Sequence, residues 1–331
     1  MSSSETIRAL ILLSGGLDSQ LAVVLLKSQD IQVTAVVFKS IFFDGQAAVD
    51  AAARLDIPLK VIDFNDTLLG LIEHPSHGFG AGLNPCIDCH TAMIRTAGEI
   101  MRGNGFHFVA TGEVLNERPM SQNRRILPLI ARESGLEGYL LRPLSAKLLD
   151  ITEPEKNKWV DREKLLALEG RSRRTQLALA REFGIISFPQ PAGGCLLTDP
   201  GYGRRLRDLR THNELRNLTA IRLLRAGRHF RLGKTKLIVG RNKADNEILE
   251  RTADNGTILL KVTSVPGPVA IISRPASETE LQLAAAICAR YSDRKANIPV
   301  AIEVTDEKNG KGTRIIETLP AEQSVIDTLR V

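Results

Sequence analysis

Short apolar runs alternate with amphipathic segments through the N-terminal half of the chain. Continuous apolar runs are typical of strands buried on both faces of a parallel sheet, whereas apolar positions spaced three and four residues apart predict helices. The alternation predicts an α/β fold built on a doubly wound parallel sheet, in which ligands bind at the carboxyl ends of the strands. The predicted strands span residues 7–13, 31–38, 59–63 and 106–110, and the predicted helices span 18–28, 44–56 and 88–102.

Beyond about residue 220 the pattern of apolar positions changes. Short strands surround two helices, which predicts a smaller α+β domain with its own apolar core. We therefore expect an N-terminal domain over residues 1–200, a basic connector over 201–221 and a C-terminal domain over 222–331. The predicted C-terminal strands span 228–232, 235–239, 257–263, 268–273 and 299–305, and the helices span 243–252 and 277–291.

The first predicted strand runs through a glycine turn directly into a helix. Free backbone N–H groups and the positive end of the helix dipole meet there, which makes the turn a candidate anion site. Gly15 and Gly16 allow the backbone to approach a phosphate, while Ser14 and Ser19 add hydroxyl donors and Asp18 is a candidate Mg²⁺ ligand. The turn lacks the Gly-Lys-Ser/Thr sequence of a Walker loop.

Three of the four cysteines stand in unusual sequence contexts. Cys86 and Cys89 form a C-x₂-C pair at the start of a predicted helix, where the helix N-terminus favours thiolate. Cys195 ends a run of two prolines and two glycines, Phe188–Cys195, which predicts a shaped loop holding its side chain. Cys288 lies on the apolar side of a predicted helix, where we expect a small buried hydrophobic residue.

Three kinds of chemistry fit Cys86, Cys89 and Cys195. The first is a [4Fe–4S] cluster held by three thiolates, with one iron open to an exogenous sulfide. The second is a persulfide pair, in which one cysteine carries the sulfur and another resolves the resulting disulfide. The third is structural Zn²⁺, with His90 or another residue as the fourth ligand. The spacing of the cysteines does not separate these alternatives.

The positive charge of the chain is unevenly distributed. The 331 residues have a formal net charge of +6, yet residues 201–241 alone contain ten arginines together with Lys234 and Lys236. Such a block suits a polyanion, because each phosphate contact releases counterions, and nucleic acid is therefore the expected partner. A solvated helix face is the alternative.

Composition also bears on the compartment. Four cysteines in 331 residues argue against a disulfide framework. No apolar run reaches about 18 residues, and no signal peptide precedes the first strand. We therefore expect a cytoplasmic protein without a membrane partner.

The glycine turn Ser14-Gly15-Gly16-Leu17-Asp18-Ser19 resembles the PP-loop of the N-type ATP pyrophosphatases. Those enzymes cleave ATP between the α and β phosphates and adenylate a carbonyl or carboxylate oxygen. The resemblance implies that ATP and Mg²⁺ bind here, with the backbone N–H groups of Gly15, Gly16 and Leu17 on the phosphates.

Two further runs extend the resemblance. Ala110-Thr111-Gly112-Glu113 ends the fourth predicted strand, and Arg142-Pro143-Leu144-Ser145-Ala146-Lys147 follows another apolar run. Together with the C-x₂-C pair and the distant third cysteine, they resemble the tRNA thiouridine synthases over about residues 5–200. These include 2-thiouridylases, 4-thiouridine synthases and three-cysteine iron–sulfur thiolases.

This second resemblance implies roles for particular residues. Thr111 and Gly112 are expected near the α-phosphate, and Arg142 or Lys147 near the phosphates or the RNA. The edge at Phe38, where the second strand ends, is expected to hold adenine through backbone groups, with a place in the core as the alternative. The chain departs from the 2-thiouridylases at Glu113, where those enzymes have His, and from the 4-thiouridine synthases in lacking a THUMP domain before the PP-loop.

The C-terminal region is similar to the RNA-binding domain of the NFACT proteins over about residues 222–305. The similarity is carried by the runs Val239–Leu249 and Val265–Ile272. It implies an RNA partner for this domain and agrees with the independent argument from charge.

The two resemblances together imply ATP-dependent thiolation of a tRNA uridine. A uridine carbonyl oxygen is adenylated, and sulfur from the centre at Cys86, Cys89 and Cys195 then displaces AMP. The expected partners are tRNA and a sulfur-donor protein or sulfide, and a homodimer is plausible by family habit. One alternative is an amide-forming or lysidine-type ligase, and another is an RNA-binding protein controlled by ATP.

Overall fold

The computed structural model describes residues 6–190, 195–254, 256–294, 298–306 and 312–331. The chain forms two compact units, one ending at Asp199 and the other spanning Pro200–Val331. Each unit is described by itself. Residues 191–194 of the predicted loop before Cys195 lie outside the described residues.

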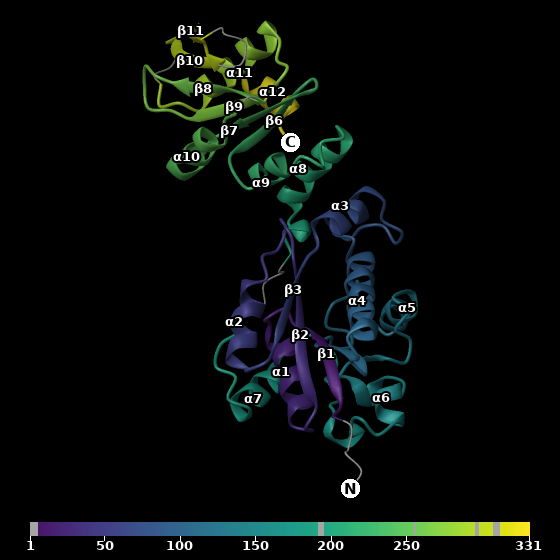
Figure 1. Ribbon diagram of the computed structural model, residues 1–331. Coiled ribbons are helices and arrows are strands. Elements are labelled where there is room, and N and C mark those ends of the chain that lie inside the picture. The colour runs from purple at the N-terminus through teal and green to yellow at the C-terminus, as the bar shows by residue number, and fades with distance from the viewer. Residues whose placement is uncertain (1–5, 191–194, 255, 295–297, 307–311) are drawn as a thin grey trace. The chain divides into compact units, whose positions relative to one another are not determined.

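The N-terminal unit is built on a parallel sheet of five strands, as the apolar pattern predicts (Figure 1). The strand order is β3-β2-β1-β4-β5, so the order reverses between β1 and β4. Leu12 at the end of β1 lies opposite Thr111 at the end of β4, and the loops after both strands therefore leave the sheet at the same edge. The strands are β1 (Arg8–Leu12), β2 (Gln32–Lys39), β3 (Leu59–Asp63), β4 (Phe108–Thr111) and β5 (Leu140–Leu141).

Helices cover both faces of this sheet (Figure 1). On one face α1 (Leu17–Lys27), α2 (Gln46–Arg54) and α7 (Arg174–Glu182) enclose a core of leucine, valine and alanine side chains. On the other face α4 (Cys86–Gly103) packs on β1 and β4 and contacts α5 (Ile126–Glu133). The other helical segments of this unit are α3 (Asn65–Glu73), η1 (Ala146–Leu148), α6 (Glu153–Lys156), η2 (Arg162–Lys164) and η3 (Leu196–Thr198).

The C-terminal unit contains an antiparallel sheet of six strands in the order β11-β10-β8-β9-β7-β6. Its largest core lies between the sheet and α11 (Glu278–Arg290), and a smaller one involves Leu249 of α10 (Lys243–Thr252). The α+β prediction is thereby confirmed. The strands are β6 (Arg228–Leu232), β7 (Thr235–Val239), β8 (Thr257–Val262), β9 (Val269–Ser273), β10 (Val300–Asp306) and β11 (Gly312–Thr318).

Three more helices complete this unit. The segment expected as a basic connector forms α8 (Pro200–Thr211) and α9 (Leu218–Leu223), and α12 (Gln323–Leu329) lies near the C-terminus. None of the helices in the described part of the chain is long and apolar enough to cross a lipid bilayer.

Candidate functional site

The glycine turn between β1 and α1 has the geometry of an anion site. Gly15 has a φ of +78°, and a Cβ there would lie 2.2 Å from the Ala47 carbonyl carbon, so only glycine fits. Helix α1 begins after Gly16 without a side-chain cap. The Ser14 and Ser19 hydroxyls lie 3.2 Å apart, and Ser19 donates to the Gly16 carbonyl. The backbone N–H groups in the first turn of α1 therefore have no side-chain cap and can bind an anion. We call residues 14–19 the phosphate turn.

A buried glutamine fixes the shape of this turn. The Gln20 side-chain amide donates to the Gly15 carbonyl at 2.7 Å and to the Ser187 carbonyl at 3.1 Å. These two hydrogen bonds connect the phosphate turn to the segment that leads toward Cys195. Gln20 is not among the site residues predicted from the sequence. A polar residue among the buried positions of α1 nevertheless indicates a side chain that needs hydrogen-bond partners.

Asp18 presents an unsatisfied carboxylate oxygen beside the turn. Its Oδ1 is buried and has no hydrogen-bond partner among the described residues, while its Oδ2 lies 3.8 Å from Nη2 of Arg173. Burial raises the pKa of Asp18, and the positive charge of Arg173 opposes that rise. Burial and the charge of Asp18 also raise the pKa of Glu117, which places this second carboxylate nearby. An orphaned carboxylate oxygen of this kind fits a hard cation such as Mg²⁺.

The residues that follow β4 lie against the start of α1. A Cβ on Gly112 would approach the backbone nitrogen of Ser19 to 2.5 Å, so glycine is needed for this close packing. The hydroxyl of the preceding Thr111 donates to Oε2 of Glu113 at 3.0 Å. The structure thus brings Thr111 and Gly112 to the phosphate turn.

Phe38 and Lys147, which were expected at the nucleotide, both have side chains engaged elsewhere in the structure. The Phe38 ring is buried and packs edge-to-face on Phe64, with ring centroids 5.2 Å apart, so the side chain belongs to the core, which is the alternative given for this position. Nζ of Lys147 donates to the backbone carbonyl of Glu163 at 2.9 Å and to its carboxylate at 3.1 Å. Lys147 would have to exchange these contacts to reach a phosphate.

Arg142 belongs to a buried ionic network instead. Its Nε donates to Glu113 at 2.9 Å and its Nη2 donates to the Leu127 carbonyl at 3.1 Å. His90 Nδ1 lies 3.1 Å from the other carboxylate oxygen of Glu113. Burial alone would raise the pKa of Glu113, but Arg142 and His90 lower it to about 2. Arg142 is therefore engaged away from solvent, which leaves Lys147 as the candidate of this pair for the phosphates or RNA.

Replacing Glu113 by Gln is expected to lower the free energy of unfolding by about 3–5 kcal/mol near neutral pH, because it leaves the Arg142 charge buried without a carboxylate. The folded-state pKa of Glu113 is depressed, so its contribution is present above the unfolded value of 4.5 and is lost as the pH falls toward 2. Urea unfolding across this pH range should therefore show the difference between the two proteins narrowing in acid.

The exposed Glu137 provides the matched control. Its Gln variant should unfold like the unaltered chain at every pH. A Glu113 difference that stayed constant down to the pKa of about 2 would contradict the ion-pair explanation.

The C-x₂-C pair opens helix α4, as the sequence predicts. Cys86 is its first residue, and Pro85 before it provides no side-chain cap. The Asn84 amide donates to the Cys86 sulfur at 3.1 Å and lies 3.8 Å from the Met120 sulfur. The loop after β4 therefore contacts the phosphate turn at Gly112 and the surroundings of Cys86 at Met120.

Backbone contacts bring the third cysteine to this pair. The Leu83 amide donates to the Leu197 carbonyl at 3.2 Å, and a Cβ on Gly82 would lie 2.2 Å from the same oxygen. Burial raises the pKa of the Cys89 thiol, and negative charge on Cys195 and Cys86 raises it further. The three thiols therefore lie within electrostatic range of one another, although about a hundred residues separate Cys195 from the pair.

The arrangement is not that of a formed metal centre. Within the described ranges, no three His, Cys, Asp or Glu side chains are grouped so as to hold a metal ion. Among these residues the structure therefore supports neither the iron–sulfur cluster nor the zinc site. Cys288 of α11 is fully buried in the core between this helix and the sheet, and burial raises its pKa to about 12, which confirms the prediction of a small hydrophobic residue.

Two family models match parts of the chain. Residues 7–150 match the tRNA methyl transferase HUP domain, and residues 227–330 match the NFACT protein RNA binding domain. The first match covers the sheet, the phosphate turn and the C-x₂-C pair. The second covers the antiparallel sheet together with α10, α11 and α12.

Curated relatives align with the N-terminal part. The chain is 29% identical over 168 residues to the tRNA-specific 2-thiouridylase MnmA of Bradyrhizobium sp. (strain ORS 278), covering 44% of this chain and 41% of that protein. It is 30% identical over 157 residues to the protein of the same name from Synechocystis sp., covering 42% and 43%. The chain thus spans about two fifths of the length of the curated relatives it matches.

Two solved structures are also similar. A predicted subunit of tRNA methyltransferase from Methanocaldococcus jannaschii is 17% identical, with a TM-score of 0.34, over 53% of this chain and 75% of that one. The C-terminal part of a fibronectin/fibrinogen-binding protein from Streptococcus suis is 16% identical, with a TM-score of 0.29, over 48% and 72%. The chain thus joins a region that matches the tRNA methyl transferase HUP domain, and is similar to 2-thiouridylases, to a region that matches the NFACT protein RNA binding domain.

Proposed function

We propose that the chain thiolates a uridine of tRNA in two steps, adenylation and sulfur transfer. One observation supports the coupling of both steps at a single site. The loop after β4 packs on Asp18 and Ser19 through Gly112, and its Met120 contacts Asn84, whose amide contacts the Cys86 sulfur. A phosphate turn and a cysteine centre are therefore neighbours of the same loop.

In the first step the turn holds the phosphates of ATP. The first-turn N–H groups of α1 and the Ser14 and Ser19 hydroxyls bind phosphate oxygens, and Gln20 keeps the turn in shape. Asp18 would hold Mg²⁺, which neutralises phosphate charge when bound. The uridine carbonyl oxygen attacks the α-phosphorus and pyrophosphate leaves, so the oxygen becomes part of a good leaving group.

In the second step sulfur replaces that oxygen. We favour the persulfide alternative, because three thiols within electrostatic range of one another supply both a carrier and a resolving cysteine. A persulfide donor first transfers its outer sulfur to one cysteine thiolate and leaves as a thiol. The terminal sulfur of the resulting cysteine persulfide attacks the activated carbon and AMP leaves. A second cysteine then attacks the carrier sulfur, which releases the thiolated base and leaves a disulfide that an external thiol reduces. The close approach of Cys86, Cys89 and Cys195 supplies the partners for this exchange.

The proposal is tested by product analysis with ATP, Mg²⁺, an unmodified tRNA transcript, a persulfide donor and a reducing thiol. AMP, pyrophosphate and thiouridine should form in equal amounts. Release of AMP with an amine but not with the persulfide donor would select the ligase alternative. ATP binding without pyrophosphate release would select the ATP-controlled RNA-binding protein. Iron or zinc bound in a fixed ratio and lost in Cys86→Ala would replace the persulfide with a metal centre.

A further inference from the structure

A shallow depression in the C-terminal unit lies between α8 and the end of the chain. Its volume is about 320 Å³. The residues that line it come from two places far apart in the sequence. They are Arg204, Arg207, Asp208, Thr211 and His212 from α8 and its end, and Arg330 and Val331 from the C-terminal segment. The N-terminal part of this lining lies outside residues 227–330, the range that matches the NFACT RNA-binding domain.

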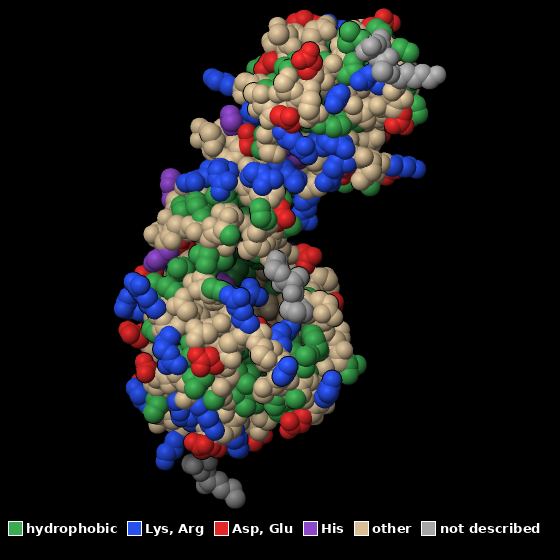
Figure 2. Space-filling model, turned by 180° about the vertical axis from the view of Figure 1, so that it is seen from behind, with side chains coloured by type: hydrophobic (Ala, Val, Ile, Leu, Met, Phe, Trp, Pro, Cys, Tyr) green, Lys and Arg blue, Asp and Glu red, His purple; other side chains and the backbone are tan. Residues whose placement is uncertain are grey.

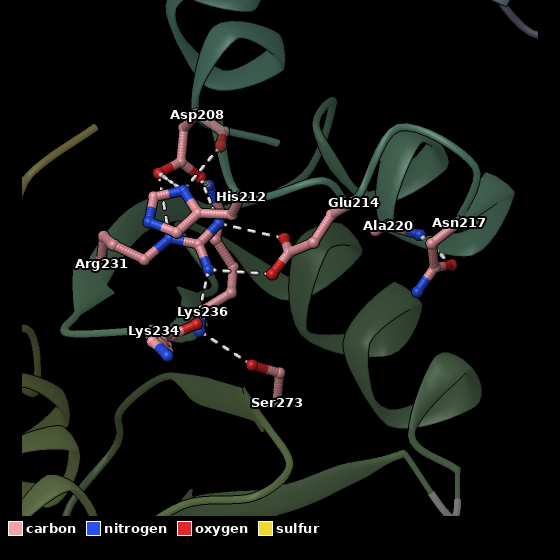
Figure 3. A network of polar contacts seen from close by, with 9 residues as sticks. All are labelled: Asp208, His212, Glu214, Asn217, Ala220, Arg231, Lys234, Lys236 and Ser273. Atoms are coloured by element: carbon pink, nitrogen blue, oxygen red, sulfur yellow. Dashed lines mark hydrogen bonds and ion pairs between the residues drawn. The ribbon is translucent and has the colours of Figure 1, made fainter. Parts of the chain in front are cut away.

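The acidic residues of this region are neutralised from within the unit. Asp208 accepts hydrogen bonds from Arg231 and Lys236, and Glu214 accepts from Arg231 at 3.0 Å (Figure 3). Burial opposes ionisation of Asp208, but the hydrogen bonds from Arg231 and Lys236 hold its pKa below the usual value. The largely buried Arg231 and Lys236 thus offset the negative charge next to the depression.

The arginines that line the depression are exposed. Arg204 and Arg207 are one turn apart on the solvent side of α8, and Arg330 is exposed as well. Residues 201–241 contain twelve Lys and Arg against only two acids, Asp208 and Glu214. Figure 2 shows a band of Lys and Arg side chains across this part of the C-terminal unit. Positive charge therefore exceeds negative charge within this segment, although Asp245 just beyond it pairs with Arg241.

The chemistry of the lining indicates what it binds. Guanidinium groups match phosphate oxygens in geometry and charge. No Phe, Tyr or Trp side chain lines the depression, and Nδ1 of its one aromatic ring, that of His212, lies 2.8 Å from the Asp208 carbonyl oxygen, so guanidinium groups rather than stacking platforms dominate the lining. A site of this composition contacts the sugar–phosphate backbone and positions an RNA without reading its bases.

We propose that Arg204, Arg207 and Arg330 form a site for the phosphate backbone of RNA. The site extends the RNA-binding surface beyond the NFACT-type domain onto α8. The inference rests on the proposed function, since it takes the polyanion to be the tRNA substrate. The test measures RNA binding alone, without ATP or a sulfur source. Its result can therefore contradict the RNA site without contradicting thiolation, and can support the RNA site even if the chain does not thiolate tRNA.

The test compares the full chain with the double variant Arg204→Ala/Arg207→Ala. Affinity for an unmodified tRNA transcript is measured by fluorescence anisotropy over a series of salt concentrations. The variant should bind roughly 10–100-fold more weakly, and the slope of log K against log[salt] should fall by about 2, one for each lost phosphate contact. A short RNA duplex of unrelated sequence should lose affinity by the same factor, because its phosphates are the same.

Two further variants make the result specific. Arg251→Ala/Arg314→Ala removes two exposed positive charges from the same unit, but those arginines are paired with Glu247 and Glu278. This control should bind nearly as well as the unaltered chain. Arg204→Lys/Arg207→Lys keeps the charge and should keep most of the salt slope. Equal losses in the alanine variant and the control would overturn the site, as would an unchanged salt slope in the alanine variant.

Discussion

Replacing Asp18 by Asn is expected to lower the rate of pyrophosphate release at least about 10³-fold, the size of effect typical when a group that stabilises developing phosphate charge is removed. Asn keeps the shape of the side chain but removes the negative charge. The buried Oδ1 of Asp18, for which the described part of the chain provides no partner, would no longer be a carboxylate oxygen able to hold Mg²⁺. Pyrophosphate release in the presence of ATP, tRNA and Mg²⁺ measures the effect directly.

Asp50 provides the control for this variant. It lies exposed on α2 and its carboxylate accepts a hydrogen bond from Gln46. Asp50→Asn should release pyrophosphate at the rate of the unaltered chain. A rate for Asp18→Asn within a few-fold of normal would remove Asp18 from the adenylation step.

Replacing Cys195 by Ala is expected to separate the two steps. The phosphate turn and Asp18 stay intact, so in a single turnover pyrophosphate should still form within about twofold of the normal rate, with AMP left attached to the tRNA. Thiouridine should fall at least about 10³-fold, because residues that act as a unit lose nearly all activity when one is removed. Mass spectrometry of the nucleosides and a parallel pyrophosphate assay give the two readouts.

Cys288 is the matched control for the cysteine variant. It is fully buried in the core of the C-terminal unit, far in sequence from the proposed centre. Cys288→Ala should thiolate normally and lose only some stability through the small cavity it leaves. A normal thiouridine yield from Cys195→Ala would show that this cysteine does not take part in sulfur transfer.

The sequence revealed most of the parallel sheet, because its strands are continuous apolar runs. It did not predict α3 or α8. Helix α8 begins Pro-Gly-Tyr-Gly and is rich in arginine, so it resembled a polar connector. Its buried residues Tyr202, Leu206 and Leu209 nevertheless repeat at helical spacing, and that signal was available. Strand β11 escaped prediction because Ile316 is its only buried residue, so no alternation marks it.

The candidate site also has one part that the sequence predicts and other parts that it does not. The phosphate turn is a local feature, since a strand, two glycines and a helix start fall within a dozen residues. The approach of Cys195 to Cys86 depends on a backbone hydrogen bond between Leu83 and Leu197, and backbone atoms leave no trace in side-chain patterns. The buried ion pair between Arg142 and Glu113 likewise joins residues that follow two neighbouring strands, β5 and β4. The spacing of apolar residues along the chain does not predict such a pair.

The network around Asp208 bears on how the C-terminal unit can be isolated. A fragment cut where the NFACT-type match begins, at Gly227, would lack both Asp208 and Glu214. Arg231 and Lys236, whose side chains are only 10% and 7% exposed in the intact unit, would then lose both these carboxylate partners and helix α8, which carries Asp208. The loss of this ionic network lowers the free energy of unfolding of a domain whose total stability is only about 5–15 kcal/mol. A fragment for expression, or for fusion to another protein, should therefore begin at Pro200 rather than at Gly227. The folding unit is longer than the range that matches the NFACT family model.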